Sequence, residues 1–239
     1  MKEKFYIGSS KTLYQSDEEN SLIMSFNDTF KLKDKTSVLI PGKGIINNDI
    51  SAFLMQKLDL IGIETHFIKK NNMRQQLIQF VDVFPIQLSI SSLASGRYVI
   101  DFGMEEGFVF DSPIIDFRIK NTDLNYPVIN EHQIDVFSWL NKKEISNLKK
   151  VAIRVHDFLT GVFAGVGIRL VDIKLEFGRV FNGEDYIIML TDEISPDTCK
   201  LWDISSNEKL CYEIVETNPD HVMHAYQEVL KRLNIKIEL

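Results

Sequence analysis

Acidic side chains crowd the end of an apolar run in the segment TDEISPDTCKLWD, residues 191–203. The preceding residues, Tyr186–Leu190, are apolar and predict a buried strand. Asp192, Glu193 and Asp197 follow directly. Carboxylates this close together repel one another, so the cluster is costly unless a cation neutralises it. The position of these acids at the end of a core strand therefore indicates a functional site.

A strand with one charged face precedes this cluster. In residues 171–177 apolar side chains alternate with Asp172, Lys174 and Glu176, so the charged side chains share one face. A solvent-exposed strand often mixes charges in this way. The pair Asn182-Gly183 then separates this run from the next apolar run, which is a strong signal for a hairpin with a two-residue turn.

That hairpin would bring the two charged segments together. A two-residue turn places Asp192 beside Ile173, and a shift of one residue would decide whether Asp192 or Glu193 shares the face of Glu176. Carboxylate oxygens suit Mg²⁺, which is usually held by one or two carboxylates together with phosphates and water. The pattern predicts a metal–phosphate site, with Lys174 able to reach an anionic substrate or a phosphoryl oxygen.

Two loops are candidates for further phosphate contacts. In Gly8-Ser-Ser-Lys11 the small residues would let backbone N–H groups approach phosphate oxygens, and Lys11 supplies a positive charge. Pro41-Gly-Lys-Gly44 precedes the first predicted helix but lacks the spacing of a P-loop. Taken alone, each loop is better interpreted as a simple turn.

Composition limits the classes of protein. The 239 residues suffice for one large domain or two small ones, and 44% hydrophobic with 26% charged residues is ordinary for a soluble globular protein. A net charge of −7 argues against a general nucleic-acid binder. No apolar run approaches the ~18 residues that span a bilayer, and no apolar signal segment opens the chain, so we expect a cytoplasmic protein without a membrane anchor. Two cysteines make neither a disulfide framework nor a metal site, so we expect Cys199 and Cys211 to be free thiols.

Short strands dominate the first third of the chain. They are expected at Lys4–Ile7, Lys11–Gln15, Ser21–Phe26, Ser37–Ile40 and Thr65–Ile68. A helix capped by Asn47 or Asn48 and ended by Gly62 interrupts them. A further strand at residues 80–91 contains Pro85, which implies a sheet edge or a bend.

The second part of the chain is richer in helix. Helices are expected at residues 142–163, capped by Asn141, and at residues 219–233, started by Asn218-Pro219. We expect two α+β parts, an antiparallel-sheet part at residues 1–84 and a larger part at residues 85–239 with the metal and substrate site.

Several motifs together resemble the SAICAR synthetase family. LVDIKLEFGR followed by TDEISPDTCKLWD is similar to the signature region of that family. The likeness continues in GKGIINNDIS, GIETHFI, GMEEG, NTDLNYPVINEHQ and HAYQEVLKRL, and so covers nearly the whole chain.

The resemblance implies an ATP-grasp-like fold with ATP in the cleft between the two α+β parts. It also implies a reaction of purine biosynthesis, in which ATP and Mg²⁺ serve to join the carboxylate of the imidazole ribonucleotide CAIR to the amine of L-aspartate. An acyl phosphate would form on the way to SAICAR, ADP and phosphate.

The resemblance further assigns roles to individual residues. The Gly8 loop and Lys11 would cover the phosphates of the nucleotide, and the segment from Phe84 to Gln87 would line its adenine. Glu176 and Asp192 would hold Mg²⁺. Lys174 would contact the CAIR side, and Ser195 and Asp197 would shape the substrate pocket.

The chain departs from the family pattern mainly on the substrate side. Ser91 stands where the family has an arginine expected to bind the ribonucleotide phosphate, and Arg97 stands where it has a serine. Arg97 could reach the same phosphate from the next loop, or it could be a surface charge. Lys200 replaces another arginine, Tyr126 an acid, and Cys211–Glu216 the family's charged DKDRFR run.

These departures leave three interpretations open. The chain could be an active SAICAR synthetase with a compensated pocket. It could also be a ligase that uses another carboxylate and amine, or a relative that binds Mg–nucleotide without catalysis. In the first case its partners are the small molecules ATP, CAIR and L-aspartate, and a homo-oligomer is plausible because family members often assemble.

Overall fold

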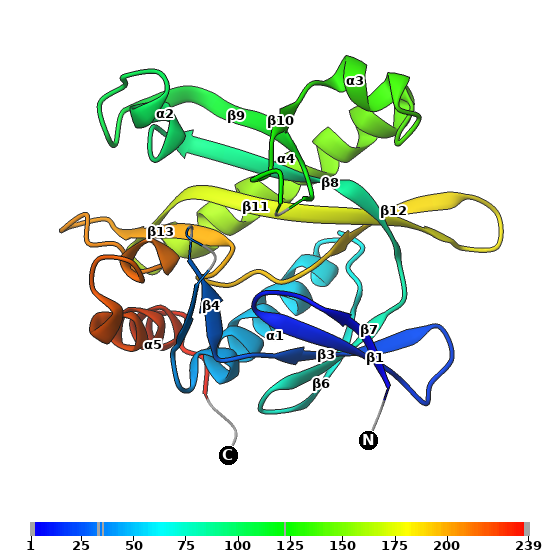
Figure 1. Cartoon of the computed structure of the whole chain (residues 1–239), viewed down its shortest axis with the longest axis horizontal. Helices are drawn as coiled ribbons and strands as arrows, with labels where there is room; N and C mark the ends of the chain where they lie inside the picture. The colour runs from blue at the N-terminus through cyan, green and yellow to red at the C-terminus, as the bar shows by residue number, and fades with distance from the viewer. Residues whose placement is uncertain (1–2, 33, 35, 122, 237–239) are drawn as a thin grey trace.

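The computed structural model describes residues 3–32, 34, 36–121 and 123–236. Its first sheet is antiparallel and has the strand order β1–β2–β3–β7–β6 (Figure 1). The strands are β1 (Lys4–Ile7), β2 (Lys11–Gln15), β3 (Ser21–Phe26), β7 (Gln75–Gln79) and β6 (Phe67–Asn72). A small pair, β4 (Thr29–Lys31) and β5 (Ser37–Leu39), connects this sheet to helix α1 (Lys43–Leu60).

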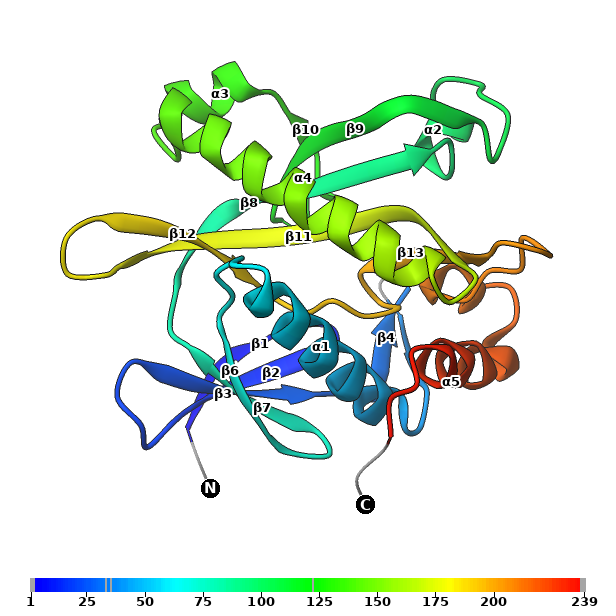
Figure 2. The same cartoon turned by 180° about the vertical axis from the view of Figure 1, so that it is seen from behind.

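The second sheet carries most of the core. Its order is β10–β9–β8–β11–β12, and β13 also pairs with β11. The strands are β10 (Val128–Ile129), β9 (Val109–Ile119), β8 (Asp82–Leu93), β11 (Ile168–Phe181), β12 (Tyr186–Thr191) and β13 (Cys199–Asp203). Helix α4 (Lys142–Ala164) runs across β8 and β11 (Figure 2).

Short helices complete the fold. They are α2 (Arg97–Ile100), α3 (Glu131–Val136) and α5 (Val222–Arg232), with 3₁₀ turns η1 (Tyr212–Ile214) and η2 (Pro219–His221). One hydrophobic core contains Ile50 and Leu54 of α1, Leu159 of α4, Ile173 of β11 and Val229 of α5. Helix α1 therefore belongs to the same core as the second sheet. The predicted boundary between residues 84 and 85 falls inside β8, and the division into two parts stays a prediction.

The start of α1 differs from the sequence expectation. The helix begins at Lys43 and not after Asn47 or Asn48, and Gly42 precedes it with a left-handed φ of 88°. The carboxylate of Asp28 accepts hydrogen bonds from the backbone N–H groups of Gly42 and Gly44, which leaves fewer N–H groups unpaired at this helix start. Gly62, with φ of 73°, follows the last helical turn as predicted.

The strand that contains Pro85 lies inside the sheet. Strand β8 pairs with β9 on one side and β11 on the other, so of the two alternatives predicted for Pro85 the sheet edge is wrong. Its register with β11 shifts between Glu176 and Gly178, and this irregularity accommodates a residue that has no N–H to donate. The other alternative, a bend, corresponds to this irregularity in the strand pairing.

The hairpin between β11 and β12 has a longer turn than predicted. Phe181 pairs with Tyr186, so the loop contains four residues, and the side chain of Asn182 accepts hydrogen bonds from the N–H groups of Glu184 and Asp185. The two-residue turn was wrong because this Asx-type contact stabilises a wider loop. The register shifts by two residues and places Thr191 opposite Glu176.

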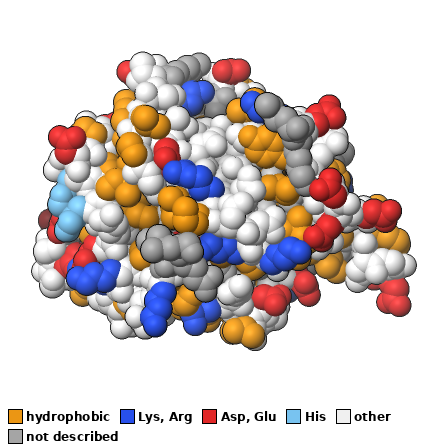
Figure 3. All heavy atoms as spheres, turned by 90° about the horizontal axis from the view of Figure 1, so that it is seen from below, with side chains coloured by type: hydrophobic (Ala, Val, Ile, Leu, Met, Phe, Trp, Pro, Cys, Tyr) orange, Lys and Arg blue, Asp and Glu red, His pale blue; other side chains and the backbone are white. Residues whose placement is uncertain are grey.

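Helix α4 has the predicted cap, since the Asn141 side chain accepts from the N–H groups of Lys143 and Glu144. Helix α5 differs in its first turn, which is the 3₁₀ turn η2, and the Asn218 side chain makes no capping hydrogen bond. In the part of the chain that the structure describes, no helix is long and apolar enough to cross a membrane. When the molecule of Figure 1 is viewed from below, Lys and Arg side chains on that face are interspersed with acidic and hydrophobic ones (Figure 3).

The bulge at Gly178 leads to a stability prediction. A Cβ at this position would lie 2.5 Å from the carbonyl oxygen of Asp82 and 2.5 Å from a methyl group of Val81. Gly178→Ala is expected to lower the free energy of unfolding by about 1–3 kcal/mol, because the backbone of β8 would have to move. At Gly161 in α4, no heavy atom lies within 4 Å of the methyl group that Gly161→Ala would add. This variant should raise the free energy of unfolding by about 0.5–1 kcal/mol. Urea unfolding would contradict the prediction if both variants shifted stability in the same direction.

Candidate active site

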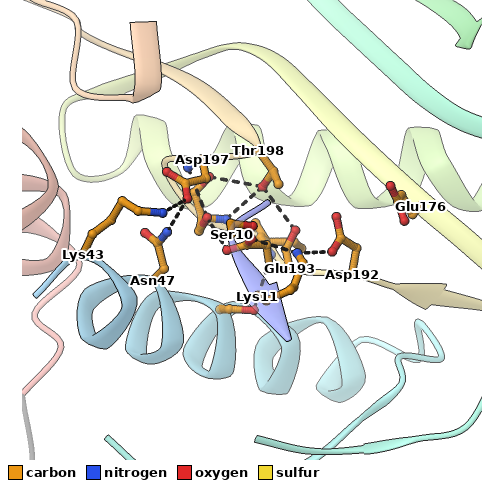
Figure 4. Close-up of polar contacts among 12 residues, drawn as sticks. Ser10, Lys11, Lys43, Asn47, Glu176, Asp192, Glu193, Asp197 and Thr198 are labelled. Carbon is orange, nitrogen blue, oxygen red and sulfur yellow. Dashed lines mark hydrogen bonds and ion pairs between the residues drawn. The ribbon is translucent and has the colours of Figure 1, made fainter. Parts of the chain in front are cut away.

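Lys11 connects the two sheets at the end of β12. Its ammonium group forms an ion pair with Asp192 and lies 2.8 Å from Oε1 of Glu193 (Figure 4). Ser10 donates a hydrogen bond to the same oxygen at 2.9 Å, and the Glu193 side chain is buried. The loop at residues 8–11, here called the Gly8 loop, is thereby held against the acidic segment at the exit of β12.

Glu176 lies beside this ion pair on β11. Its carboxylate accepts hydrogen bonds from Lys120 and Gln87. Burial and the neighbouring charge of Asp192 raise the pKa of Glu176. Burial would also raise the pKa of Asp192, but the adjacent Lys11 holds it below its usual range. The two carboxylates therefore influence each other, and each of them has a lysine as its neutralising partner.

This pair of carboxylates fits the ligand chemistry of Mg²⁺. Hard oxygen ligands suit the ion, and one or two protein carboxylates are a common number when phosphates supply the rest. Among the described residues no set of three or more His, Cys, Asp or Glu side chains groups as a metal site. A metal bound to Glu176 and Asp192 would therefore need the phosphates of a nucleotide and water to complete its coordination.

The turn at Ser195–Asp197, here called the SPD turn, is anchored from α1 and α5. Lys43 pairs with Oδ2 of Asp197 and is fully buried. Asn47 donates to the same oxygen at 2.9 Å, and the hydroxyl group of Tyr226 donates to Oδ1 at 2.6 Å. Both carboxylate oxygens of Asp197 are thus engaged by protein groups.

Ser195 belongs to the same anchored turn. Its hydroxyl group donates to Oε2 of Glu193 at 2.7 Å and accepts from the N–H of Asp197 at 3.1 Å. Ser195 is 1% exposed. The turn therefore connects the Lys11 ion pair to the Lys43 ion pair.

Lys174 has a different environment from the other lysines. Its ammonium nitrogen lies 4.3 Å from the centre of the Tyr212 ring, and no ion pair joins it to a carboxylate of the described residues. Burial lowers the pKa of Lys174, although Asp172 opposes the change. Asp172 itself accepts hydrogen bonds from Ser89 at 2.8 Å and Ser91 at 2.6 Å.

Two further cations lie near the β8–β9 connection. Lys200 donates to Oγ of Ser95 at 2.9 Å and lies 3.5 Å from Glu213. Arg97 lies 3.7 Å from Asp116 at the closest, and its Nε and Nη1 atoms are buried without a hydrogen-bond partner. The same two nitrogens lie 3.9 Å from Asp101 and 3.7 Å from Asp116, so the guanidinium has carboxylates at ion-pair distance but leaves both donors without a hydrogen bond.

Comparison with known proteins identifies the family of the chain. The family model for SAICAR synthetase matches residues 4–233. The chain belongs to the SAICAR synthetase family. Two relatives, both named phosphoribosylaminoimidazole-succinocarboxamide synthase, come from Rickettsia bellii, at 56% identity, and Rickettsia massiliae, at 58%. Each alignment covers 99% of this chain and 100% of the relative.

Solved structures confirm the predicted α+β fold class. The phosphoribosylaminoimidazole-succinocarboxamide synthase of Ehrlichia chaffeensis is 40% identical, with a TM-score of 0.95 over 99% of this chain and 100% of that one. A SAICAR synthetase in complex with ADP is 31% identical, with a TM-score of 0.91 over 98% and 99% of the two chains.

The structure brings part of the predicted nucleotide site together. Lys11, Asp192, Glu176 and Gln87 form a connected group, and the Gly8 loop is attached to it through Ser10. Phe84 is instead 3% exposed within the hydrophobic core, with the Arg179 guanidinium 5.8 Å from its ring centre. The assignments of these residues to ATP and Mg²⁺ stay predictions.

Sequence reasoning missed several residues of this site. Lys43 was interpreted as part of a turn, and the ammonium group of Lys120 was not considered as a partner of Glu176. Asp28 was assigned no role, yet it makes two hydrogen bonds with Arg74 and holds the turn that carries Lys43. The GKG motif contained a partial signal for Lys43, because each glycine has its own structural reason: Gly42 adopts a left-handed φ of 88°, and a Cβ at Gly44 would lie 2.7 Å from the backbone oxygen of Phe26.

His66 leads to a prediction about pH. Burial lowers its pKa to about 4, well below the ordinary value near 6.5. The unfolded chain therefore binds a proton that the folded chain does not, and stability falls as the pH drops from about 6.5 to 4, by up to about 3 kcal/mol. His66→Gln should lose less stability than the wild type over this pH range. His132→Gln, which removes an exposed imidazole, should lose as much stability as the wild type. Identical pH slopes for wild type and His66→Gln in urea unfolding would contradict the prediction.

Proposed function

We propose that the chain joins the carboxylate of CAIR to the amine of L-aspartate at the expense of ATP, giving SAICAR, ADP and phosphate. Membership of the SAICAR synthetase family makes it an ATP-dependent ligase of purine biosynthesis. One observation carries the residue-level account: Lys11 of the first sheet meets Asp192 of the second sheet beside Glu176. We further propose that it acts in the cytoplasm.

The nucleotide is proposed to bind where the two sheets meet. The N–H groups of the Gly8 loop and the ammonium group of Lys11 contact the ATP phosphates, and the backbone from Phe84 to Gln87 lines the adenine. Glu176 and Asp192 would hold Mg²⁺, which would supply neutralising charge when bound. Lys11 and Lys120 each pair with one of these carboxylates in the structure, so both are close enough to transfer their hydrogen bonds to phosphate oxygens.

The chemistry follows from the poor reactivity of a carboxylate. An oxygen of the CAIR carboxylate attacks the γ-phosphorus of ATP, the bond to the ADP oxygen breaks, and an acyl phosphate forms. The aspartate amine then attacks the acyl carbon, phosphate leaves with the former carboxylate oxygen, and the amine loses a proton. Lys174 is proposed to hold the carboxylate and the phosphoryl oxygens, which gain negative charge in the transition state.

The remaining cations are proposed to bind the ribonucleotide phosphate. Lys200 and Ser95 are hydrogen-bonded to each other, and Arg97 offers two donors without a hydrogen-bond partner from the same connection. The SPD turn shapes the pocket through its backbone, because the oxygens of Asp197 are already engaged. Arg97→Ala is therefore expected to weaken CAIR binding, and an unchanged affinity would mean that Arg97 is only a surface charge.

The test of the overall function is ADP release by the purified protein with Mg–ATP. The account expects release only when CAIR and L-aspartate are both present. Release with another acid in the absence of CAIR would indicate a ligase with different substrates. Binding of Mg–ADP without turnover would indicate a non-catalytic relative.

A further inference from the structure

An aromatic side chain takes the place of an acidic partner for Lys174. The Tyr212 ring, on the 3₁₀ turn η1, lies 4.3 Å from the Lys174 nitrogen, within the range of a cation–π contact. The other lysines of the site, Lys11, Lys43 and Lys120, all pair with carboxylates. No described carboxylate pairs with Lys174 in this way.

This difference matters for what Lys174 can bind. A carboxylate partner would accept one or two of the three N–H donors of the ammonium group and would neutralise its charge. An aromatic face attracts the cation through its quadrupole and accepts no conventional hydrogen bond. Lys174 therefore keeps its donors and its charge available for anionic oxygens of a substrate.

The Tyr212 ring itself contacts a second aromatic ring. Phe30 of β4 stacks on it with ring centres 6.2 Å apart and an interplanar angle of 20°. Lys43 lies 5.9 Å from the centre of the Phe30 ring. The backbone N–H of Tyr212 donates to the carbonyl of Pro196 in the SPD turn at 3.0 Å. Pairwise contacts thus link Lys43, which pairs with Asp197 of the SPD turn, through the Phe30 and Tyr212 rings to Lys174.

We propose that Tyr212 is a positioning residue that fixes the Lys174 ammonium group at the substrate by a cation–π contact and leaves its N–H donors free. This inference rests on the role proposed above for Lys174. It also gives a physical reason for Tyr212 in the segment Cys211–Glu216, which departs from the charged run of the family.

The ring and the hydroxyl group can be separated by two variants. Tyr212→Phe keeps the aromatic face and should retain kcat within about twofold. Tyr212→Leu removes it and should lower kcat by about tenfold, the order of magnitude of one cation–π contact, with the affinity for Mg–ADP unchanged. Phe30→Leu, which leaves Tyr212 in place without its stacking partner, should cause a smaller loss of the same kind and provides a second test if Tyr212→Leu folds poorly.

A double-mutant cycle with Lys174→Met tests whether Tyr212 acts through Lys174. The proposal expects Tyr212→Leu to lower kcat in the wild type but to add no further loss in the Lys174→Met background. Equal losses in both backgrounds, or equal losses for Tyr212→Phe and Tyr212→Leu, would overturn it and leave Tyr212 as a packing residue. Wild-type kcat in Lys174→Met would overturn both this inference and the proposed role of Lys174, so the two failures are distinguishable.

Discussion

Lys174→Met is expected to lower kcat by about 10²–10³-fold, with little change in the affinity for Mg–ATP. A preorganised charge that stabilises developing negative charge in a water-poor site typically contributes an effect of this order. Lys174 fits that description, because it is half-buried, has no acidic partner within ion-pair distance among the described residues, and lies over an aromatic ring. Steady-state kinetics with CAIR, aspartate and ATP varied in turn measures the effect.

The matched control for this variant is Lys69→Met on β6. Lys69→Met makes the same chemical change at an exposed position, where Lys69 pairs with the exposed Glu18. Its kcat should remain at the wild-type value. A Lys174→Met enzyme that lost only affinity for ATP, with kcat intact, would place Lys174 on the nucleotide side and contradict its proposed role.

Asp197→Ala is expected to lower the free energy of unfolding by about 3–5 kcal/mol. The change would leave the ammonium group of Lys43 buried without a counter-charge, and breaking a buried ion pair from one side carries a cost of this order. The hydroxyl group of Tyr226 and the amide of Asn47 would lose their acceptor as well. Urea unfolding followed by circular dichroism measures the difference.

A double-mutant cycle distinguishes the ion pair from simple loss of packing. Lys43→Met together with Asp197→Leu removes both charges, and this variant should be more stable than Asp197→Ala alone. Tyr226→Phe, which deletes one donor, should cost only about 1 kcal/mol. Strictly additive losses for Lys43→Met and Asp197→Leu would show that the two charges do not depend on each other.

The sequence predicted those parts of the fold that local contacts determine. Alternation in residues 171–177 and the Asn-Gly pair identified the β11–β12 hairpin, and Asn141 identified the start of α4. The start of α1 could not be predicted, because the groups that bind its first N–H donors belong to Asp28, well before the helix in the sequence. The hairpin turn was mispredicted because the Asn182 side chain stabilises a four-residue loop, and no residue pattern excluded that choice.

The candidate site was predictable only in part for the same reason. Glu176 and Asp192 stood out as carboxylates on adjoining strands, and the motif resemblance supplied Lys11 as a third member. That Lys11 pairs directly with Asp192 depends on how two sheets pack, which periodicity does not encode. Lys43 was overlooked because its partner Asp197 is distant in sequence, and the ring beneath Lys174 is visible only once η1 has been placed.

The most direct test of the account follows an oxygen atom through the reaction. CAIR labelled with ¹⁸O in its carboxylate is incubated with the enzyme, Mg–ATP and L-aspartate, and the released phosphate is analysed by mass spectrometry. An acyl phosphate intermediate predicts that one ¹⁸O atom appears in each phosphate, together with ADP and SAICAR in equal amounts. Phosphate free of label would contradict activation of this carboxylate by ATP, and with it the roles proposed for Lys174, Glu176 and Asp192.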